Sequence, residues 1–105
     1  MTADLDDLRS AFAELTRLHG WAPLQTPRSL TLALTGRVGA VASLLQWQPE
    51  TPGAPEAATA ELRDELADCL VYLVALSDAL AVDVVGDAVT RLRRAVDGSR
   101  RTSTA

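Results

Sequence analysis

The sequence contains no lysine, so arginine supplies all ten of its basic residues against fourteen acidic ones. The formal net charge is −4, which is the opposite of what a nucleic-acid-binding surface requires. We therefore expect no nucleic-acid partner. The sequence also has a single cysteine, Cys69, which cannot form an internal disulfide and is expected to fill space in the core.

Long apolar runs are absent as well. The longest, "CLVYLVAL", is far shorter than the ~20 residues that a membrane-spanning helix needs. Met1 is followed at once by the acidic stretch "TADLDDLRS", which is unlike a secretory signal peptide. These two features predict a cytoplasmic protein that does not enter the membrane.

Apolar residues recur at helical spacing throughout the chain, and no stretch alternates as a strand does. The pattern predicts an all-α fold with helices at Asp4–His19, Pro27–Trp47, Glu61–Leu80 and Asp83–Gly98. Thr26 and Asp83 are the expected N-caps of the second and fourth helices, and Pro27 suits a first helical position. Residues 48–60 are rich in proline and alanine and are predicted to form a mobile loop.

Four such helices predict a four-helix bundle in one domain, residues 1–98, followed by a disordered tail at 99–105. The third helix is apolar on nearly every side after its second turn, more than a chain of 105 residues can cover. A homodimer is therefore expected. Gly36 and Gly39 lie inside the second helix, which suggests that another helix approaches closely there, unless the glycines are merely tolerated.

Three carboxylates follow one face of the third helix. Glu61, Glu65 and Asp68 fall within an arc of roughly 60°, with Tyr72 one turn further on. Like charges at this spacing repel, so a positive group is expected to face them. The group is either a metal ion or a basic side chain of the protein.

Several motifs together resemble the MazG-like all-α nucleoside triphosphate pyrophosphohydrolases, in particular their small single-domain branch that includes the dCTP pyrophosphatases. They are the tryptophan before a loop, "TPRSL", "VG", "LQW", "ELAD" and "LVYL", spread over residues 21–92. The resemblance implies a four-helix fold that hydrolyses a nucleoside triphosphate to the monophosphate and pyrophosphate. It also implies Mg²⁺, bound by an E-x-x-E pair on the second helix and an E-x-x-D pair on the third.

Only half of that ligand set is present. Glu65 and Asp68 match the second pair, with Glu61 as a possible addition, whereas Arg37 and Ala40 stand where the first pair has its two glutamates. The change replaces one carboxylate by a permanent cation. We expect Arg37 to reach Glu65 or Asp68 as a bidentate partner and take the place of the ion, the alternative being an arginine that only meets solvent.

The resemblance also assigns substrate-binding positions, which fall here on Trp47, Tyr72, Trp21, Gln25 and Arg91. Gln25 replaces a common histidine, Arg91 keeps the charge of a phosphate-contacting lysine, and Ala95 replaces an asparagine one turn later. An aromatic ring can stack on a base, although the two tryptophans could equally be packing residues.

The sequence therefore predicts a nucleotide pyrophosphohydrolase homologue with weak or lost hydrolysis, and assigns no catalytic acid, base or nucleophile. A nucleoside triphosphate is the expected small-molecule partner. The alternative is a nucleotide-binding regulatory protein, or a dimeric scaffold, without catalysis.

Overall fold

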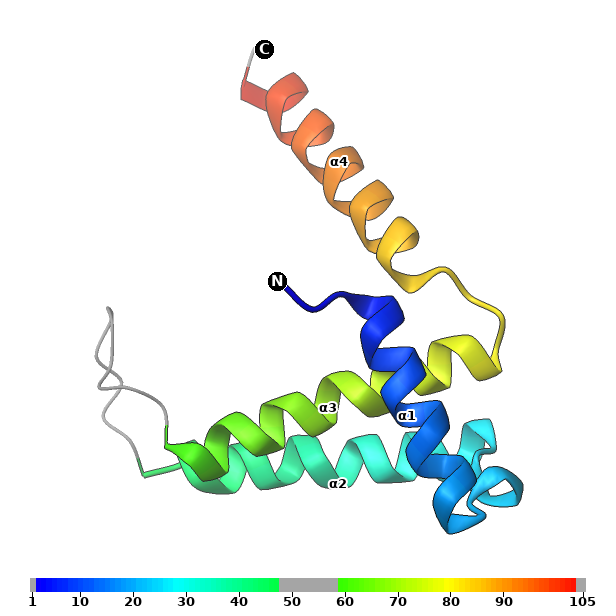
Figure 1. The fold of residues 1–105 in the computed structure, drawn as a ribbon. Helices are drawn as coiled ribbons and strands as arrows, with labels where there is room; N and C mark the ends of the chain where they lie inside the picture. The colour runs from blue at the N-terminus through cyan, green and yellow to red at the C-terminus, as the bar shows by residue number, and fades with distance from the viewer. Residues whose placement is uncertain (1, 48–58, 104–105) are drawn as a thin grey trace.

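The computed structural model describes residues 2–47 and 59–103, and this part of the chain contains helices and no strand (Figure 1). The predicted all-α class is therefore confirmed. In chain order the elements are α1 (Leu5–His19), the 3-10 helix η1 (Ala22–Leu24), α2 (Pro27–Leu45), α3 (Ala60–Ala79) and α4 (Val84–Ser103).

Each long helix begins at a residue whose side chain accepts a hydrogen bond from the first turn. Asp4 and Asp7 form a reciprocal capping box at α1. Thr26 caps α2, with Pro27 in the first helical position, as the sequence predicts. At α4 the carboxylate of Asp83 accepts from the backbone N–H of Gly86 at 3.0 Å, which confirms the second predicted cap.

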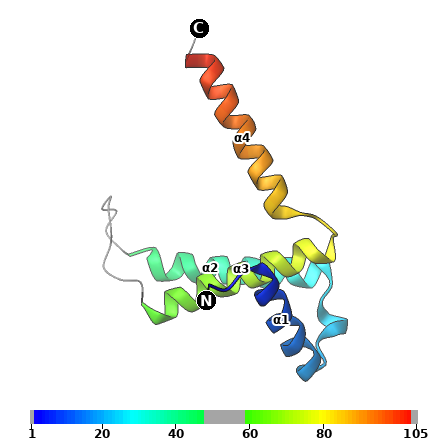
Figure 2. The ribbon, with the colours of Figure 1, turned by 45° about the horizontal axis from the view of Figure 1, so that its top comes forward.

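Helices α2 and α3 lie side by side and antiparallel, and α1 crosses the end of this pair where α2 begins and α3 ends (Figures 1 and 2). The core is small. Within the described residues, the buried apolar side chains are Leu30 of α2 and Val74 of α3, joined by the buried hydroxyl of Ser77. That hydroxyl donates to the carbonyl of Leu73 at 2.8 Å, so its burial leaves no unsatisfied group.

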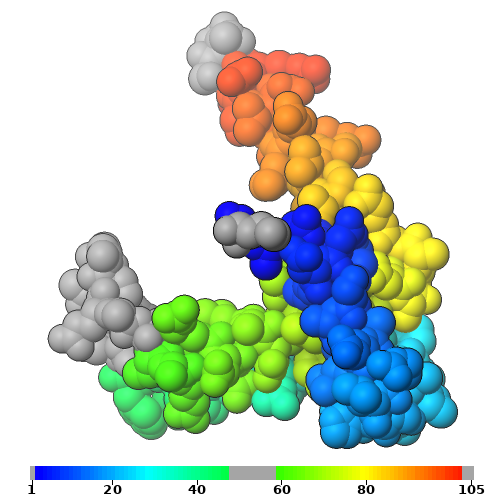
Figure 3. Space-filling model, viewed as in Figure 1, coloured from blue at the N-terminus to red at the C-terminus, as the bar shows by residue number. Residues whose placement is uncertain are grey.

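Helix α4 stands away from the other three helices (Figures 2 and 3). The four helices of the predicted bundle are thus present, but in the described part of the chain the main packing contacts are those of α3 with α2 and with α1. At the joint, Ala81 adopts a left-handed backbone with φ of 56°, and the N–H of Val82 donates to the carbonyl of Ser77 at 2.8 Å. This closes α3 with the type of cap usually built on glycine, and α4 leaves at a bend of 99°.

No single helix in the described part of the chain combines the length and hydropathy of a membrane span. Helices α3 and α4 reach that threshold only when they are counted together across their bend.

Several predicted details are wrong. Helix α4 does not end at Gly98 but continues through Ser103, so residues 99–103 of the predicted disordered tail are helical. The ~1 kcal/mol that an internal glycine costs is offset here by basic residues in the last turn, which favour a helix C-terminus. Helix α2 ends two residues early, at Leu45, with Trp47 in the turn that follows. The predicted loop falls mostly on residues 48–58, outside the described part.

The expected close approach at Gly36 and Gly39 is also absent among the described residues. A Cβ placed at either glycine would meet no heavy atom within 4 Å. The apolar stripe of α2 is buried at Leu30, yet Val38 and Leu45 on the same stripe are 53% and 43% exposed. One neighbouring helix, α3, is too little to cover the whole stripe.

Candidate functional site

The acidic face of α3 meets a cation supplied by α2. Arg37 Nη1 donates to Glu65 Oε2 at 3.3 Å and to Glu65 Oε1 at 3.5 Å, and it lies 3.5 Å from Asp68 Oδ2. Helix geometry explains why one cation reaches both acids, because residues three apart project from the same face. Glu65 is the most enclosed of the three, with a side chain 19% exposed against 42% for Arg37 and 45% for Asp68.

The predicted pairing of Arg37 with this acidic face is therefore confirmed, and it involves both acids. The predicted bidentate geometry is wrong. One guanidinium nitrogen, Nη1, contacts both carboxylates, whereas in a bidentate pair two guanidinium nitrogens bind the two oxygens of one carboxylate. Glu61 lies exposed in the first turn of α3, and Ala40 follows Arg37 on α2 without a polar group.

The pairing has an electrostatic consequence for Arg37. The hydrogen bond to Glu65, followed by the charges of Glu65 and Asp68, raises the pKa of the Arg37 guanidinium above its usual value. The guanidinium is therefore charged at neutral pH and above it.

The described residues do not fit the Mg²⁺ site that the resemblance implies. Magnesium prefers an octahedron of oxygen ligands, and in proteins carboxylates supply the charge that holds it. Across residues 2–47 and 59–103, no three His, Cys, Asp or Glu side chains gather closely enough to hold an ion. Glu65 and Asp68, the two acids that the resemblance assigns to the ion, are both paired with Arg37.

The predicted substrate-binding residues are dispersed. Tyr72 of α3 lies near Arg37 of α2. Its ring packs edge to face against Phe12 of α1, with ring centroids 6.4 Å apart. Trp21 stacks on His19 at 4.5 Å, and Trp47 is 86% exposed. The two tryptophans lie beyond opposite ends of α2, which is roughly 28 Å long, so one chain cannot bring both to one base.

Gln25 lines an open groove of about 470 Å³ between α1, the start of α2 and the end of α3, together with Phe12 and Val74. Within the described residues, Gln25 Oε1 and Thr16 Oγ1 are buried there without a hydrogen-bond partner. Sequence reasoning missed this groove, because no local pattern marks a space between three helices. Arg37, Glu65 and Asp68 together form what we call the Arg37 cluster. Arg91 lies on α4, away from this cluster.

The sequence also gave no sign of the ion pair that joins α1 to α3. Arg9 Nε donates to Asp78 Oδ2 at 2.8 Å and Arg9 Nη2 donates to Asp78 Oδ1 at 3.1 Å. The two residues are 69 positions apart, and nothing in either local pattern connects them. This is the bidentate arginine–carboxylate geometry that was expected, incorrectly, at Arg37.

Comparison with known proteins agrees with the resemblance. The chain is 42% identical over 84 residues to dCTP pyrophosphatase 1 of Bos taurus, a match that covers 76% of this chain and 50% of that protein. It is 38% identical over 92 residues to dCTP pyrophosphatase 1 of Mus musculus, covering 84% of this chain and 54% of that protein. No family model matches.

Among solved structures, a pyrophosphatase from Archaeoglobus fulgidus superposes with a TM-score of 0.67 at 21% identity, covering 97% of this chain and 94% of that one. At this identity the likeness concerns the fold. The chain spans about half the length of the two mammalian relatives. Over the length that it matches, the chain belongs to the dCTP pyrophosphatase-like family of MazG-like proteins.

Proposed function

We propose that this chain is a nucleoside-triphosphate-binding member of the family in which metal-dependent release of pyrophosphate is strongly weakened or lost. One observation carries the proposal: Arg37 Nη1 lies 3.3 Å from Glu65 and 3.5 Å from Asp68, the two acids that the resemblance assigns to Mg²⁺. Mg²⁺, where bound, would neutralise phosphate oxygens and activate water. Here the acids are already neutralised in part by a guanidinium.

The charge of the site explains why the ion is disfavoured. Four carboxylates would carry a charge of about −4, whereas two carboxylates and one guanidinium carry about −1, which leaves little to offset the cost of dehydrating Mg²⁺. An ion entering here must also displace Arg37 from both acids. We therefore expect metal affinity to be low.

Retained nucleotide binding is supported by the groove at α1 and α3. Its volume of about 470 Å³ lies within the range of small-molecule sites, and its walls are mostly apolar. Gln25 and Thr16, which line the groove, each hold a buried side-chain oxygen without a hydrogen-bond partner among the described residues. The Phe12–Tyr72 pair links this groove to the Arg37 cluster. A cytoplasmic location is part of the same proposal.

The test restores the missing acids. The double variant Arg37→Glu/Ala40→Glu places two carboxylates on the face of α2 that meets Glu65 and Asp68. The variant should bind Mg²⁺ or Mn²⁺ in a calorimetric titration, and the parent should not. Pyrophosphate release from ribo- and deoxyribonucleoside triphosphates, dCTP included, should be at least about 100-fold faster in the variant, the upper end of what disturbing a metal site's outer shell costs.

Arg28→Glu/Thr31→Glu is the matched control. It makes the same change of charge at the same spacing on α2, but at exposed positions that face away from α3. It should bind the ion no better than the parent. Equal ion binding by the parent and the Arg37→Glu/Ala40→Glu variant would refute the proposal, as would metal-dependent turnover by the parent itself.

A second candidate function, a dimeric scaffold that binds no nucleotide, is favoured by the apolar side of α4, where Val85, Val89, Leu92 and Val96 are 43–67% exposed. Nucleotide binding separates the two. With dCTP added in the presence of EDTA, a nucleotide-binding protein should show a saturable change in tryptophan fluorescence, whereas a scaffold should show none.

A further inference from the structure

The groove between α1, α2 and α3 carries no excess positive charge. Of the residues that line it, Arg9 and Asp78 are the charged ones. Every nitrogen of the Arg9 guanidinium already has a carboxylate partner, because Nε and Nη2 donate to Asp78 and Nη1 donates to Asp6 at 3.5 Å. The groove therefore suits an uncharged part of a ligand, and its arginine is already paired.

The start of α2, which borders the groove, adds little attraction for an anion. A helix N-terminus binds phosphate through backbone N–H groups that have no other acceptor. Pro27 has no N–H, and the N–H of Ser29 donates to Thr26 Oγ1 at 3.1 Å. The N–H of Leu30 donates to the carbonyl of Thr26 at 2.9 Å. In this first turn only the N–H of Arg28 is left without an acceptor among the described residues.

The Arg37 cluster is the next charged feature along α3, and its charge is negative. Asp68 precedes Val74, a residue of the groove wall, by about 9 Å of helix. One guanidinium faces two carboxylates at 3.3 and 3.5 Å, so the cluster carries about −1 at neutral pH. A phosphate at the outer edge of Arg37 meets one attraction and two repulsions from the carboxylates behind it.

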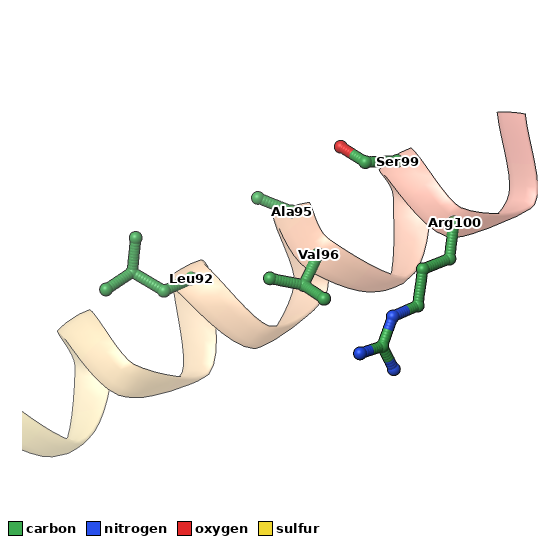
Figure 4. Close-up of a pocket in the computed structure, with 5 residues that line it drawn as sticks. All are labelled: Leu92, Ala95, Val96, Ser99 and Arg100. Atoms are coloured by element: carbon green, nitrogen blue, oxygen red, sulfur yellow. The ribbon is translucent and has the colours of Figure 1, made fainter. Parts of the chain in front are cut away.

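The arginines of α4 do not reverse this charge within one chain. Figure 4 shows a recess on α4 whose lining residues are Leu92, Ala95, Val96, Ser99 and Arg100. All of them belong to α4, which stands away from the groove and from the Arg37 cluster (Figures 2 and 3). The described part of a single chain therefore brings no further cation from α4 to the phosphates of a nucleotide held in the groove.

We propose that this chain recognises the nucleoside part of its ligand and gains no affinity from the phosphates, because the phosphates meet the negatively charged Arg37 cluster. The inference rests on the proposed function, since it presupposes that a nucleotide binds. The ligand class is then a nucleoside with any number of phosphates. A nucleoside and its monophosphate bind at least as tightly as the triphosphate, so the protein responds to the whole pool of that nucleoside.

Calorimetric titration with deoxycytidine, dCMP and dCTP, each with Mg²⁺ and with EDTA, tests the order of affinities. The Kd of dCTP should be no lower than about one third of the Kd of deoxycytidine, with either addition. Added NaCl gives a second readout. Salt screens repulsion, so the affinity for dCTP should stay level or rise, whereas a site that holds phosphates through cations loses affinity.

The outcomes separate this proposal from the proposed function. If dCTP binds at least about tenfold more tightly than deoxycytidine, the proposal is overturned while nucleotide binding stands. Arginines that reach the site from a second copy of the chain would produce that result. If none of the three ligands binds, nucleotide binding itself is refuted, and this proposal with it.

Two double variants test the role of the Arg37 cluster. Glu65→Gln/Asp68→Asn leaves Arg37 as its one charge, so dCTP should bind at least about fivefold more tightly while deoxycytidine binding is unchanged. Glu14→Gln/Asp87→Asn is the matched control, because it removes the same charge from exposed positions on α1 and α4. It should leave the affinity for dCTP unchanged. An equal gain in both variants, or no gain in the first, would overturn the proposal.

Discussion

At the residue scale, two residues of α2, Arg37 and Ala40, separate this protein from the metal-binding motif that it resembles. The pairing of Arg37 with Glu65 and Asp68 could be predicted because helical spacing puts those acids on one face and a motif fixes which residue of α2 opposes them. The detailed geometry could not be predicted. It depends on how far apart α2 and α3 lie, which is set by the packing of many side chains.

The Arg9–Asp78 ion pair could not be predicted from the sequence, because no local pattern connects the two residues. Both side chains are part-exposed, at 41% and 43%, so its main role is to position α1 on α3 and not to add much stability. We expect Arg9→Asp to speed amide hydrogen exchange in α1, because α1 loses its ion pair with α3. The swap Arg9→Asp/Asp78→Arg should restore slow exchange. If the swap exchanges as fast as the single variant, the pair does not hold α1.

At the element scale, helix starts were more predictable than helix ends. An N-cap is written in one residue, such as Thr26 or Asp83, whose side chain meets the first turn. Gly98 looks like an end in the sequence but lies in helical backbone, because a glycine ends a helix only if the chain turns left-handed there. Gly20 ends α1 in the left-handed conformation that a glycine favours, whereas the left-handed residue after α3 is Ala81, which no composition rule selects.

Two glycines of α4 make a matched pair. Apart from its chain neighbours and its own helix backbone, a Cβ at Gly98 would meet no heavy atom of the described residues within 4 Å. Gly98→Ala should therefore raise the free energy of unfolding by about 0.8–1 kcal/mol, the difference in helix propensity. At Gly86 the added Cβ would collide with the carboxylate of Asp83, which caps the helix. The stabilisation that Gly86→Ala gains from helix propensity should therefore be cancelled by loss of the Asp83 cap, which is worth ~1 kcal/mol.

Urea denaturation followed by circular dichroism measures both variants. Equal stabilisation by Gly86→Ala and Gly98→Ala would mean that Asp83 does not cap α4.

At the scale of the whole molecule, the all-α class and its four helices could be predicted, because apolar periodicity is a property of each segment. The placement of α4 could not. Periodicity tells which side of a helix is to be buried but not against what, and α3 and α4 both keep apolar sides open within this chain. The sequence did indicate that α3 has more apolar surface than one chain can cover.

If the chain forms the homodimer that its sequence predicts, its stability should depend on protein concentration. Folding coupled to association follows mass action, so the thermal midpoint should rise as the protein concentration is raised tenfold. Leu92→Glu should unfold at a lower temperature that does not change with concentration. Thermal melts recorded by circular dichroism at both concentrations make the comparison, with Thr90→Glu as control. A thermal midpoint of the parent that does not change with protein concentration would contradict the homodimer.

The two tryptophans have a practical consequence. One precedes α2 and is shielded on one side by His19, whereas the other follows α2 and is 86% exposed. A soluble quencher such as iodide should therefore silence Trp47 well before Trp21. The protein thus carries a distinguishable optical reporter beyond each end of its central helix, and events at either end can be followed in the unlabelled chain.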